Sequence, residues 1–190
     1  MFIFPTLISN ANGFRLVLCF FLRSMININV TFTTNFTRAM IPVLQKSKNS
    51  LIYMLSSFSG IVPVGMMPVY SATKAYNDVL ARALAAELAP TGVTVKSVVP
   101  HFVVSAMSGF SRATWAVPDA VSFAHATIAK TGIWDVSIAP HWWHDLTMRI
   151  ASAAPDFLIG GFTVKQMKAA RVKLMRRAEK KAAEKAAAAQ

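Results

Sequence analysis

A tyrosine and a lysine four residues apart, Tyr70 and Lys74, are the residues of this sequence whose types and spacing best suit proton transfer. Residues four apart lie on one face of a helix, so both side chains can reach the same ligand. A tyrosine with its ordinary pKa of about 10 is a poor acid or base near neutral pH. A neighbouring ammonium group stabilises the phenolate and lowers that pKa towards the working range. The pair therefore predicts a general acid with its own electrostatic activator.

A serine thirteen residues before the tyrosine, Ser57, completes the candidate group. Its hydroxyl could hydrogen-bond the oxygen of a substrate carbonyl. A tyrosine and a lysine at this spacing also occur together at ordinary solvated helix starts. The elements that position these residues decide between a catalytic and a merely structural interpretation.

The surrounding elements predict a parallel sheet with these residues at one edge. Residues 50–56 form a short, continuous apolar run, typical of a strand buried on both faces. A helix is expected over residues 71–89, followed by a β-branched strand over residues 93–99. Strand, helix and strand in this order predict two parallel strands with a crossover helix. Ligands bind at the carboxyl ends of such strands, so Ser57 and Pro100 should lie on one ligand-binding rim.

Further elements are expected on both sides of this unit. Apolar residues at helical intervals predict a helix over residues 25–46, and turn-forming residues predict an irregular loop over residues 57–68. A further helix is expected over residues 118–130. The apolar run 16–22 suits a buried strand or a membrane-associated segment, with Cys19 as a buried hydrophobic residue.

Composition and charge exclude several classes of protein. The 190 residues are 54% hydrophobic and 15% charged, which excludes a disordered chain, and a single cysteine excludes a disulfide framework. Much of the net charge of +12 lies in residues 165–190, which hold nine basic and two acidic residues and should form a solvated helix. No aromatic residue follows Phe162, so nucleic-acid binding is not predicted. His141 and His144 have no obvious third ligand, so no metal site is predicted.

Three stretches in the expected order, Ser56–Gly60, Tyr70–Ala75 and Val98–Pro100, resemble the short-chain dehydrogenase/reductase superfamily. The resemblance implies an α/β fold, namely a partial Rossmann-like, doubly wound parallel sheet followed by a C-terminal helical tail. It also implies a homodimer, paired through the helices around Asn29 and Tyr70. In that family the catalytic group is a tetrad, and the matching positions here are Asn29, Ser57, Tyr70 and Lys74.

The resemblance also implies a role for each of these positions. Tyr70 would protonate the substrate carbonyl, while Lys74 would lower its pKa and hold the nicotinamide ribose. Ser57 would fix the carbonyl, and Asn29 would help to position a water relay to Lys74; Asn27 is the less suitable alternative for that position. The residues implied in cofactor binding are Tyr70, Lys74, Pro100, Val103 and Ser105.

A narrower resemblance, carried by Met25–Asn29, Ile61–Val64 and Pro100–Ser105, is to the microsomal branch of very-long-chain 3-oxoacyl-CoA reductases and 17β-hydroxysteroid dehydrogenases. His101 matches the bulky aromatic residue of that branch. This resemblance implies an acyl-CoA or steroid substrate, NADPH as the cofactor, and the cytosolic face of the endoplasmic reticulum membrane. Trp142, Trp143 and the basic tail would then lie at the membrane surface.

One part of the family pattern is missing from this sequence. The glycine-rich phosphate-binding turn does not occur, since Gly13 is the only glycine before Gly60, and Asn10–Gly13 only faintly matches the family's Asn-Asn-Ala-Gly. Three hypotheses follow: an NADPH-dependent oxidoreductase, a truncated or degenerate non-catalytic paralogue, and a membrane-surface interaction protein. The expected organisation is an atypical apolar segment, a catalytic part, a Trp-rich region and a basic helical tail, over residues 1–24, 25–132, 133–164 and 165–190.

Overall fold

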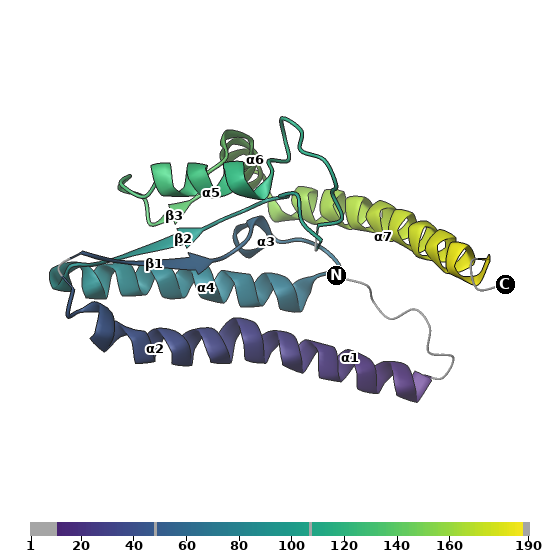
Figure 1. Cartoon of the computed structure of the whole chain (residues 1–190). Helices are drawn as coiled ribbons and strands as arrows, with labels where there is room; N and C mark the ends of the chain where they lie inside the picture. Colours follow the sequence, from purple (N-terminus) through teal and green to yellow (C-terminus); the bar gives the residue numbers. More distant parts are fainter. Residues whose placement is uncertain (1–10, 48, 107, 188–190) are drawn as a thin grey trace.

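The computed structural model describes residues 11–47, 49–106 and 108–187. Its centre is a parallel sheet of three strands, β1 (Ser50–Leu55), β2 (Val93–Val98) and β3 (Ser137–Ile138), in the order β1-β2-β3. Helices lie on both sides of the sheet, with α4, α2 and α1 on one side and α5 and α6 on the other (Figure 1). The helices are α1 (Ala11–Ile26), α2 (Thr33–Leu44), α3 (Phe58–Ile61), α4 (Pro68–Leu88), α5 (Ala120–Ala129), α6 (Trp142–Ala153) and α7 (Asp156–Ala187).

The predicted strand, crossover helix and strand are confirmed as β1, α4 and β2. β1 pairs with β2 in parallel, in a register that runs from Ser50 opposite Val93 to Leu55 opposite Val98. After α4 a short 3₁₀ turn leads to Gly92, whose φ of 78° is the left-handed conformation that ends the helix. The core between α4 and the strands is made by buried apolar side chains, namely Met54, Ala81, Leu88, Val93 and Val95.

β1 is buried on one face only, so the expected burial on both faces is wrong. The side chains of Leu51, Tyr53 and Leu55 are 39%, 39% and 56% exposed. Side chains alternate across a strand, and these three share the face opposite α4. β2 is the only strand that pairs with β1 in the described part of the chain. β1 is therefore an edge strand with an exposed apolar face.

The N-terminal apolar run is helical, which corrects the expectation of a buried strand. α1 continues through a π-helical turn, Asn27–Phe32, into α2, and Cys19 is exposed rather than buried. The helix expected over residues 25–46 thus starts earlier, at Ala11, and ends at Leu44. Residues 1–10, part of the expected N-terminal segment, lie outside the described residues.

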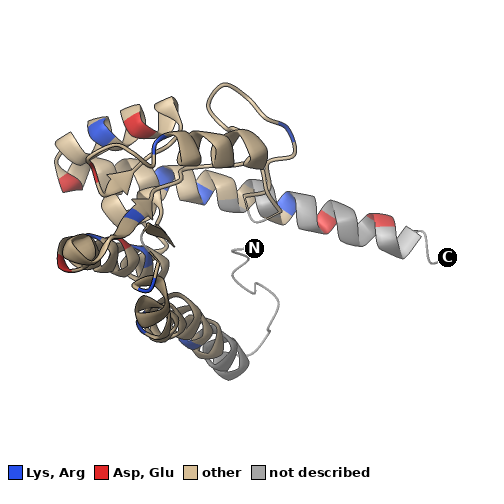
Figure 2. Cartoon of the chain, turned by 60° about the vertical axis from the view of Figure 1, so that its left-hand side comes forward, with Lys and Arg blue, Asp and Glu red and all other residues tan. Residues whose placement is uncertain are grey.

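The remaining expectations need smaller changes. The loop over residues 57–68 contains one helical turn, α3, and the helix expected over residues 118–130 is α5, which begins after Asp119 caps it through Ser122 N. The basic tail belongs to α7. The charged residues of this helix whose burial is described are exposed, and Figure 2 marks positions of charged residues along it. Among the described residues no helix combines the length and the apolar character that crossing a bilayer requires.

Candidate active site

The carboxyl ends of β1 and β2 form one rim, as the sequence predicts. The N–H of Ser56 donates to Val98 O at 2.9 Å, and the N–H of Phe58 donates to Pro100 O at 2.8 Å. These bonds continue the pairing of the two strands beyond their last regular residues. Ser57 therefore lies directly beside the segment that follows Pro100.

Ser57 is held in place by the helical turn that follows it. It is the N-cap of α3, and its Oγ accepts hydrogen bonds from Ser59 N at 3.3 Å and from Ser59 Oγ at 3.1 Å. An extended residue before a helix has this capping geometry because the first helical N–H groups lack a partner within the helix. The cap fixes the Ser57 hydroxyl at the rim.

Tyr70 and Lys74 lie on the first turns of α4 and meet Ser57 there. The Tyr70 side chain is hydrogen-bonded to that of Ser57. Lys74 Nζ lies 5.8 Å from the centroid of the Tyr70 ring and donates to Leu55 O, at the end of β1, at 2.9 Å. Three of the four predicted catalytic residues are thus brought together where β1 ends and α4 begins.

The sequence predicts that Lys74 lowers the pKa of Tyr70, but in this structure the pKa of Tyr70 is raised. Burial raises the pKa of Tyr70, and the hydrogen bond from Ser57 opposes that effect only in part. Burial also lowers the pKa of Lys74, because desolvation disfavours the ammonium form. Desolvation therefore prevails at this tyrosine, and the phenol is held in its protonated form, which is the form a general acid needs.

Asn29 reaches α4 one residue away from Lys74. It lies in the π-helical turn, and its Nδ2 donates to Thr73 Oγ1 at 3.1 Å. Thr73 Oγ1 in turn donates to Tyr70 O at 2.8 Å. π-helical turns within α-helices are frequent at functional sites, since the extra residue alters which side chains face a neighbour. The structure thus connects Asn29 to the helix that carries Tyr70 and Lys74, through Thr73.

Gly60 and Ser56 also shape the site, although neither was predicted as a site residue. A Cβ atom at Gly60 would lie 2.7 Å from the Lys74 carbonyl carbon and 2.8 Å from Ala75 N, so only glycine allows α3 to approach α4 this closely. Ser56 Oγ donates to Lys74 O at 2.8 Å. The small residues on either side of Ser57, Ser56 and Gly60, were the sequence signal for this close approach of α3 to α4, because close backbone contacts need small side chains.

The predicted cofactor-binding residues after β2 lie in a loop on the same rim. Pro100 accepts the Phe58 hydrogen bond described above. Val103 O accepts from Ser108 Oγ at 2.6 Å. Ser105 is exposed, and its Oγ accepts from Ser108 N at 3.1 Å. Ser108 thus organises this loop, and Ser105 lies at its surface.

Two histidines, His101 and His144, contact residues of the same rim. His144 of α6 is 1% exposed; its Nδ1 accepts from His101 N at 3.4 Å, and its Nε2 lies 3.1 Å from Phe102 O. The His101 ring packs on Phe58 with the centroids 4.5 Å apart. Burial lowers the pKa of both imidazoles from 6.5 to about 4, so both are neutral near pH 7. Within the described residues no three His, Cys, Asp or Glu side chains are grouped so as to hold a metal ion.

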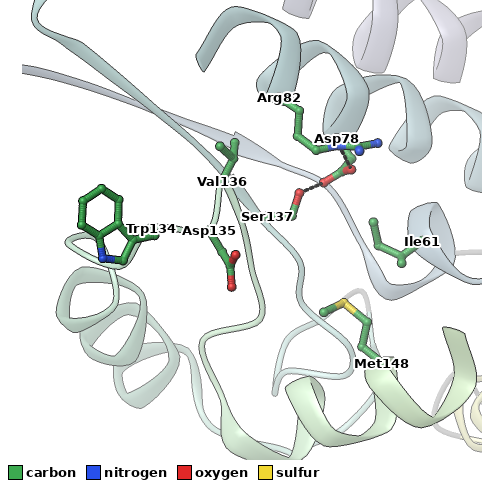
Figure 3. A pocket seen from close by; sticks show the side chains of 8 residues that line it. All are labelled: Ile61, Asp78, Arg82, Trp134, Asp135, Val136, Ser137 and Met148. Atoms are coloured by element: carbon green, nitrogen blue, oxygen red, sulfur yellow. Dashed lines mark hydrogen bonds and ion pairs between the residues drawn. The ribbon is translucent and has the colours of Figure 1, made fainter. Parts of the chain in front are cut away.

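A separate pocket lies at the β3 edge of the sheet, among α4, β3 and α6 (Figure 3). Asp78 is buried there, accepting from Ser137 Oγ at 2.7 Å and pairing with Arg82 Nε at 3.0 Å. None of the predicted catalytic or cofactor-binding residues lines this pocket. The hydrogen bond from Ser137 joins β3 to α4, while the ion pair lies within α4.

The described residues fit one end of a nicotinamide cofactor. Lys74 uses one of the three donors of its ammonium group on Leu55 O, so it has capacity to bind ribose hydroxyls beside Tyr70. A diphosphate, by contrast, needs open backbone N–H groups at a helix N-terminus. At this rim Gly60 is closed off by the backbone of α4. Lys74 and Tyr70 therefore suit the nicotinamide ribose, and Gly60 provides no diphosphate cradle.

Comparisons with known proteins agree with this geometry. A family model described as short chain dehydrogenase matches residues 20–115. The very-long-chain 3-oxoacyl-CoA reductase of Podospora anserina is 32% identical over 173 residues, which cover 87% of this chain and 50% of that reductase. The chain therefore spans about half the length of the curated relatives that it matches.

Two solved structures have a similar fold. A short-chain dehydrogenase from Burkholderia cenocepacia in complex with NADP is 25% identical, with a TM-score of 0.61 over 72% of this chain and 56% of that one. A 7beta-hydroxysteroid dehydrogenase is 16% identical, with a TM-score of 0.64 over 73% of this chain and 56% of that one. The latter similarity concerns the fold alone.

Proposed function

Because the chain belongs to the short-chain dehydrogenase family, we propose that it acts as an oxidoreductase that reduces the 3-oxo group of an acyl-CoA with NADPH. The observation that carries this proposal is the hydrogen bond between Ser57 and Tyr70, with Lys74 beside them at the strand ends. The choice of substrate is supported by the very-long-chain 3-oxoacyl-CoA reductases among the relatives. A steroid ketone, the other substrate that the sequence suggests, has weaker support because the steroid dehydrogenase is only 16% identical.

In this proposal the residues of the chain bind the carbonyl and move one proton. A nicotinamide cofactor, when bound, supplies the hydride that the carbonyl carbon needs. The Ser57 hydroxyl orients the carbonyl oxygen, and the Tyr70 phenol transfers its proton to that oxygen, so that the ketone becomes a secondary alcohol. Lys74 stabilises the phenolate that remains, because it lies 5.8 Å from the ring centroid.

The remaining cofactor and catalytic residues take supporting roles in this proposal. Lys74 and Tyr70 hold the ribose, and the loop with Pro100, Val103 and Ser105 contacts the nicotinamide end. Asn29 keeps α4 in register through Thr73 and supports the proton path at Lys74. No residue of the chain is assigned to the diphosphate.

The test is turnover of a 3-oxoacyl-CoA with NADPH by the full chain and by a Tyr70→Phe variant. Removing a general acid should lower the rate by about 10²- to 10⁴-fold. Tyr76→Phe is the matched control, because Tyr76 lies on the same helix and its hydroxyl is paired with Thr34 Oγ1 at 2.6 Å, away from the rim. Equal rates for the Tyr70→Phe variant and the unaltered chain would refute the assignment of the acid.

A second candidate function is a non-catalytic member of the family. It is favoured by one observation, the lack of a glycine-rich phosphate-binding turn in the 190 residues. Such a protein would keep the fold and bind no cofactor. Protein fluorescence titrated with NADPH separates the two candidates: saturable quenching supports the oxidoreductase, and an unchanged signal with a cooperative thermal transition supports the non-catalytic protein.

We further propose that the chain works at the cytosolic face of the endoplasmic reticulum membrane. Support comes from exposed aromatic side chains near a basic helix: Trp142 is 57%, Phe157 77% and Phe162 60% exposed, and residues 165–190 contain nine basic residues. Sedimentation with vesicles containing anionic lipid tests this. Loss of sedimentation in a Trp142→Ser, Phe157→Ser variant is expected, and binding that depends on neither residue would contradict it.

For the expected homodimer, the proposed interface is the outer surface of the π-helical turn Asn27–Phe32 and of α2. Ile28, Phe32 and Phe36 are 63%, 61% and 55% exposed, and the two phenylalanine rings stack with centroids 5.5 Å apart. An exposed apolar stripe of this kind marks an interaction site. Light scattering should give twice the monomer mass, and the mass should fall to that of a monomer in a Phe32→Ser, Phe36→Ser variant.

A further inference from the structure

The loop that leads into α4 contacts α7, a helix that is distant from it in the sequence. We infer that Thr163 and Val164 of α7 are positioning residues for Tyr70, because they fix this loop, residues 62–67, just before the helix that carries the tyrosine. The inference deepens the proposed function and rests on it for the catalytic consequence. The contacts themselves are independent of any activity.

A partly buried hydrogen bond ties the loop to α7. The N–H of Gly65 donates to Thr163 Oγ1 at 3.1 Å, and Thr163 Oγ1 donates to Gly160 O at 3.2 Å. Thr163 is only 9% exposed, although it belongs to a helix whose described residues are mostly exposed. Its hydroxyl therefore serves as both acceptor and donor in a place that water hardly reaches. Loss of the hydroxyl would leave the Gly65 N–H without its partner.

The fit between the loop and α7 leaves no space for a side chain at position 65. A Cβ atom on Gly65 would overlap with Cγ2 of Val164 and would lie 3.3 Å from the Val164 Cα. A larger residue at position 65 would therefore require Val164 to move. The hydrogen bond and this close contact come from adjacent residues of α7, so one helical turn fixes Gly65 in two ways.

The next residue shows why the loop needs such support. Met66 has a φ of 66°, the only positive value at a non-glycine residue in the described chain. Side chains disfavour this left-handed conformation, so a methionine persists in it only when its surroundings hold it. Met67 then caps α4, which begins at Pro68. Tyr70 lies in the first turn, four residues after Met66, so the conformation held by α7 sets where that turn begins.

The test compares amide hydrogen exchange of residues 62–67 in the unaltered full chain, in its Thr163→Val variant and in its Thr163→Ser variant. The valine variant keeps the shape but loses the hydroxyl, so exchange at residues 62–67 should be about tenfold faster. The serine variant keeps the hydroxyl and should exchange within about twofold of the unaltered chain. Equal exchange in the valine variant and the unaltered chain would overturn the inference.

A steric pair gives a second, independent measurement. Gly65→Ala should speed the exchange of the loop and lower the melting temperature, because the new methyl group meets Val164. Val164→Ala in the same chain removes that obstacle and should restore most of the loss. If the double variant is no better than Gly65→Ala alone, the close contact does not govern the loop.

Turnover connects these contacts to Tyr70. In the proposed reaction, Thr163→Val should lower kcat at unchanged KM for NADPH, and Thr163→Ser should restore it. A chain with no turnover at all would refute the proposed function, while the exchange measurements would still decide the role of α7 in fixing the loop. Normal kcat together with fast exchange in the valine variant would overturn the positioning role.

Discussion

The buried histidine of α6 gives a prediction with a calculable size. His144 is 1% exposed, and its two ring nitrogens are engaged by His101 N and Phe102 O. Its Nδ1 accepts a hydrogen bond, which requires a neutral ring. Burial, with smaller contributions from the nearby His101 and His141, lowers the pKa of His144 to about 4. The folded chain thus resists a protonation that the unfolded chain accepts.

Proton linkage gives the direction and the size of the change in the free energy of unfolding with pH. Between the unfolded pKa of 6.5 and the folded value of about 4, the unfolded chain binds more protons, so stability falls as the pH falls through this range. From about pH 8 to about pH 5 the loss from this one imidazole is about 2 kcal/mol. His101, whose pKa is also lowered to about 4, adds a loss of similar size. Below about pH 4 both contributions level off.

Urea unfolding at both pH values, followed by tryptophan fluorescence, measures this difference. A His144→Gln variant cannot titrate, so its free energy of unfolding should change with pH by about 2 kcal/mol less than that of the unaltered chain. The variant should also be less stable by about 1–3 kcal/mol near pH 8, because glutamine cannot satisfy both backbone partners as the ring does. His125→Gln is the matched control, because His125 is exposed on α5. If His144→Gln keeps the full pH dependence, the buried neutral ring is not its source.

Four further variants test α4 and its packing against α3. Gly60→Ala should lower the free energy of unfolding by about 1–3 kcal/mol, measured in urea, because the new Cβ would lie under 3 Å from the Lys74 backbone; an unchanged value would mean that α3 shifts freely. Asp78→Ala should cost about 1–3 kcal/mol, since Ser137 loses its buried acceptor. Arg82→Ala should cost less than about 1 kcal/mol because that side chain is 57% exposed; equal losses would contradict this. Lys74→Met should reduce turnover by about 10²-fold or more with folding intact, and full activity would exclude its electrostatic role.

The parts of the fold that the sequence predicts are those set by local patterns. The apolar run of β1, the 3.6-residue repeat of α4 and the β-branched run of β2 each determine an element within a few residues. The parallel pairing of two strands joined by a crossover helix then brings the strand ends together, so the rim and the proximity of Ser57 to Tyr70 follow. The i, i+4 spacing correctly predicts that Lys74 lies beside Tyr70.

The parts that the sequence did not predict depend on contacts between distant segments. The burial of Tyr70, which raises its pKa, comes from the packing of the rim and has no local signature. His144 supports residues 101 and 102 from over 40 positions away. The run 16–22 is apolar enough for a strand, but its continuation into the next helix decides its structure. In the same way, the helices that pack on each side of the sheet determine whether both faces of β1 are covered.

The single-sided burial of β1 also bears on how the chain behaves when it is concentrated. Its outer edge has N–H and C=O groups with no strand partner in the described part of the chain, next to the apolar side chains of Leu51, Tyr53 and Leu55. Such an edge is a template on which any extended segment can add. Self-association through strand addition therefore competes with folding as the protein concentration rises, and it sets an upper limit on the concentration at which the chain stays monodisperse.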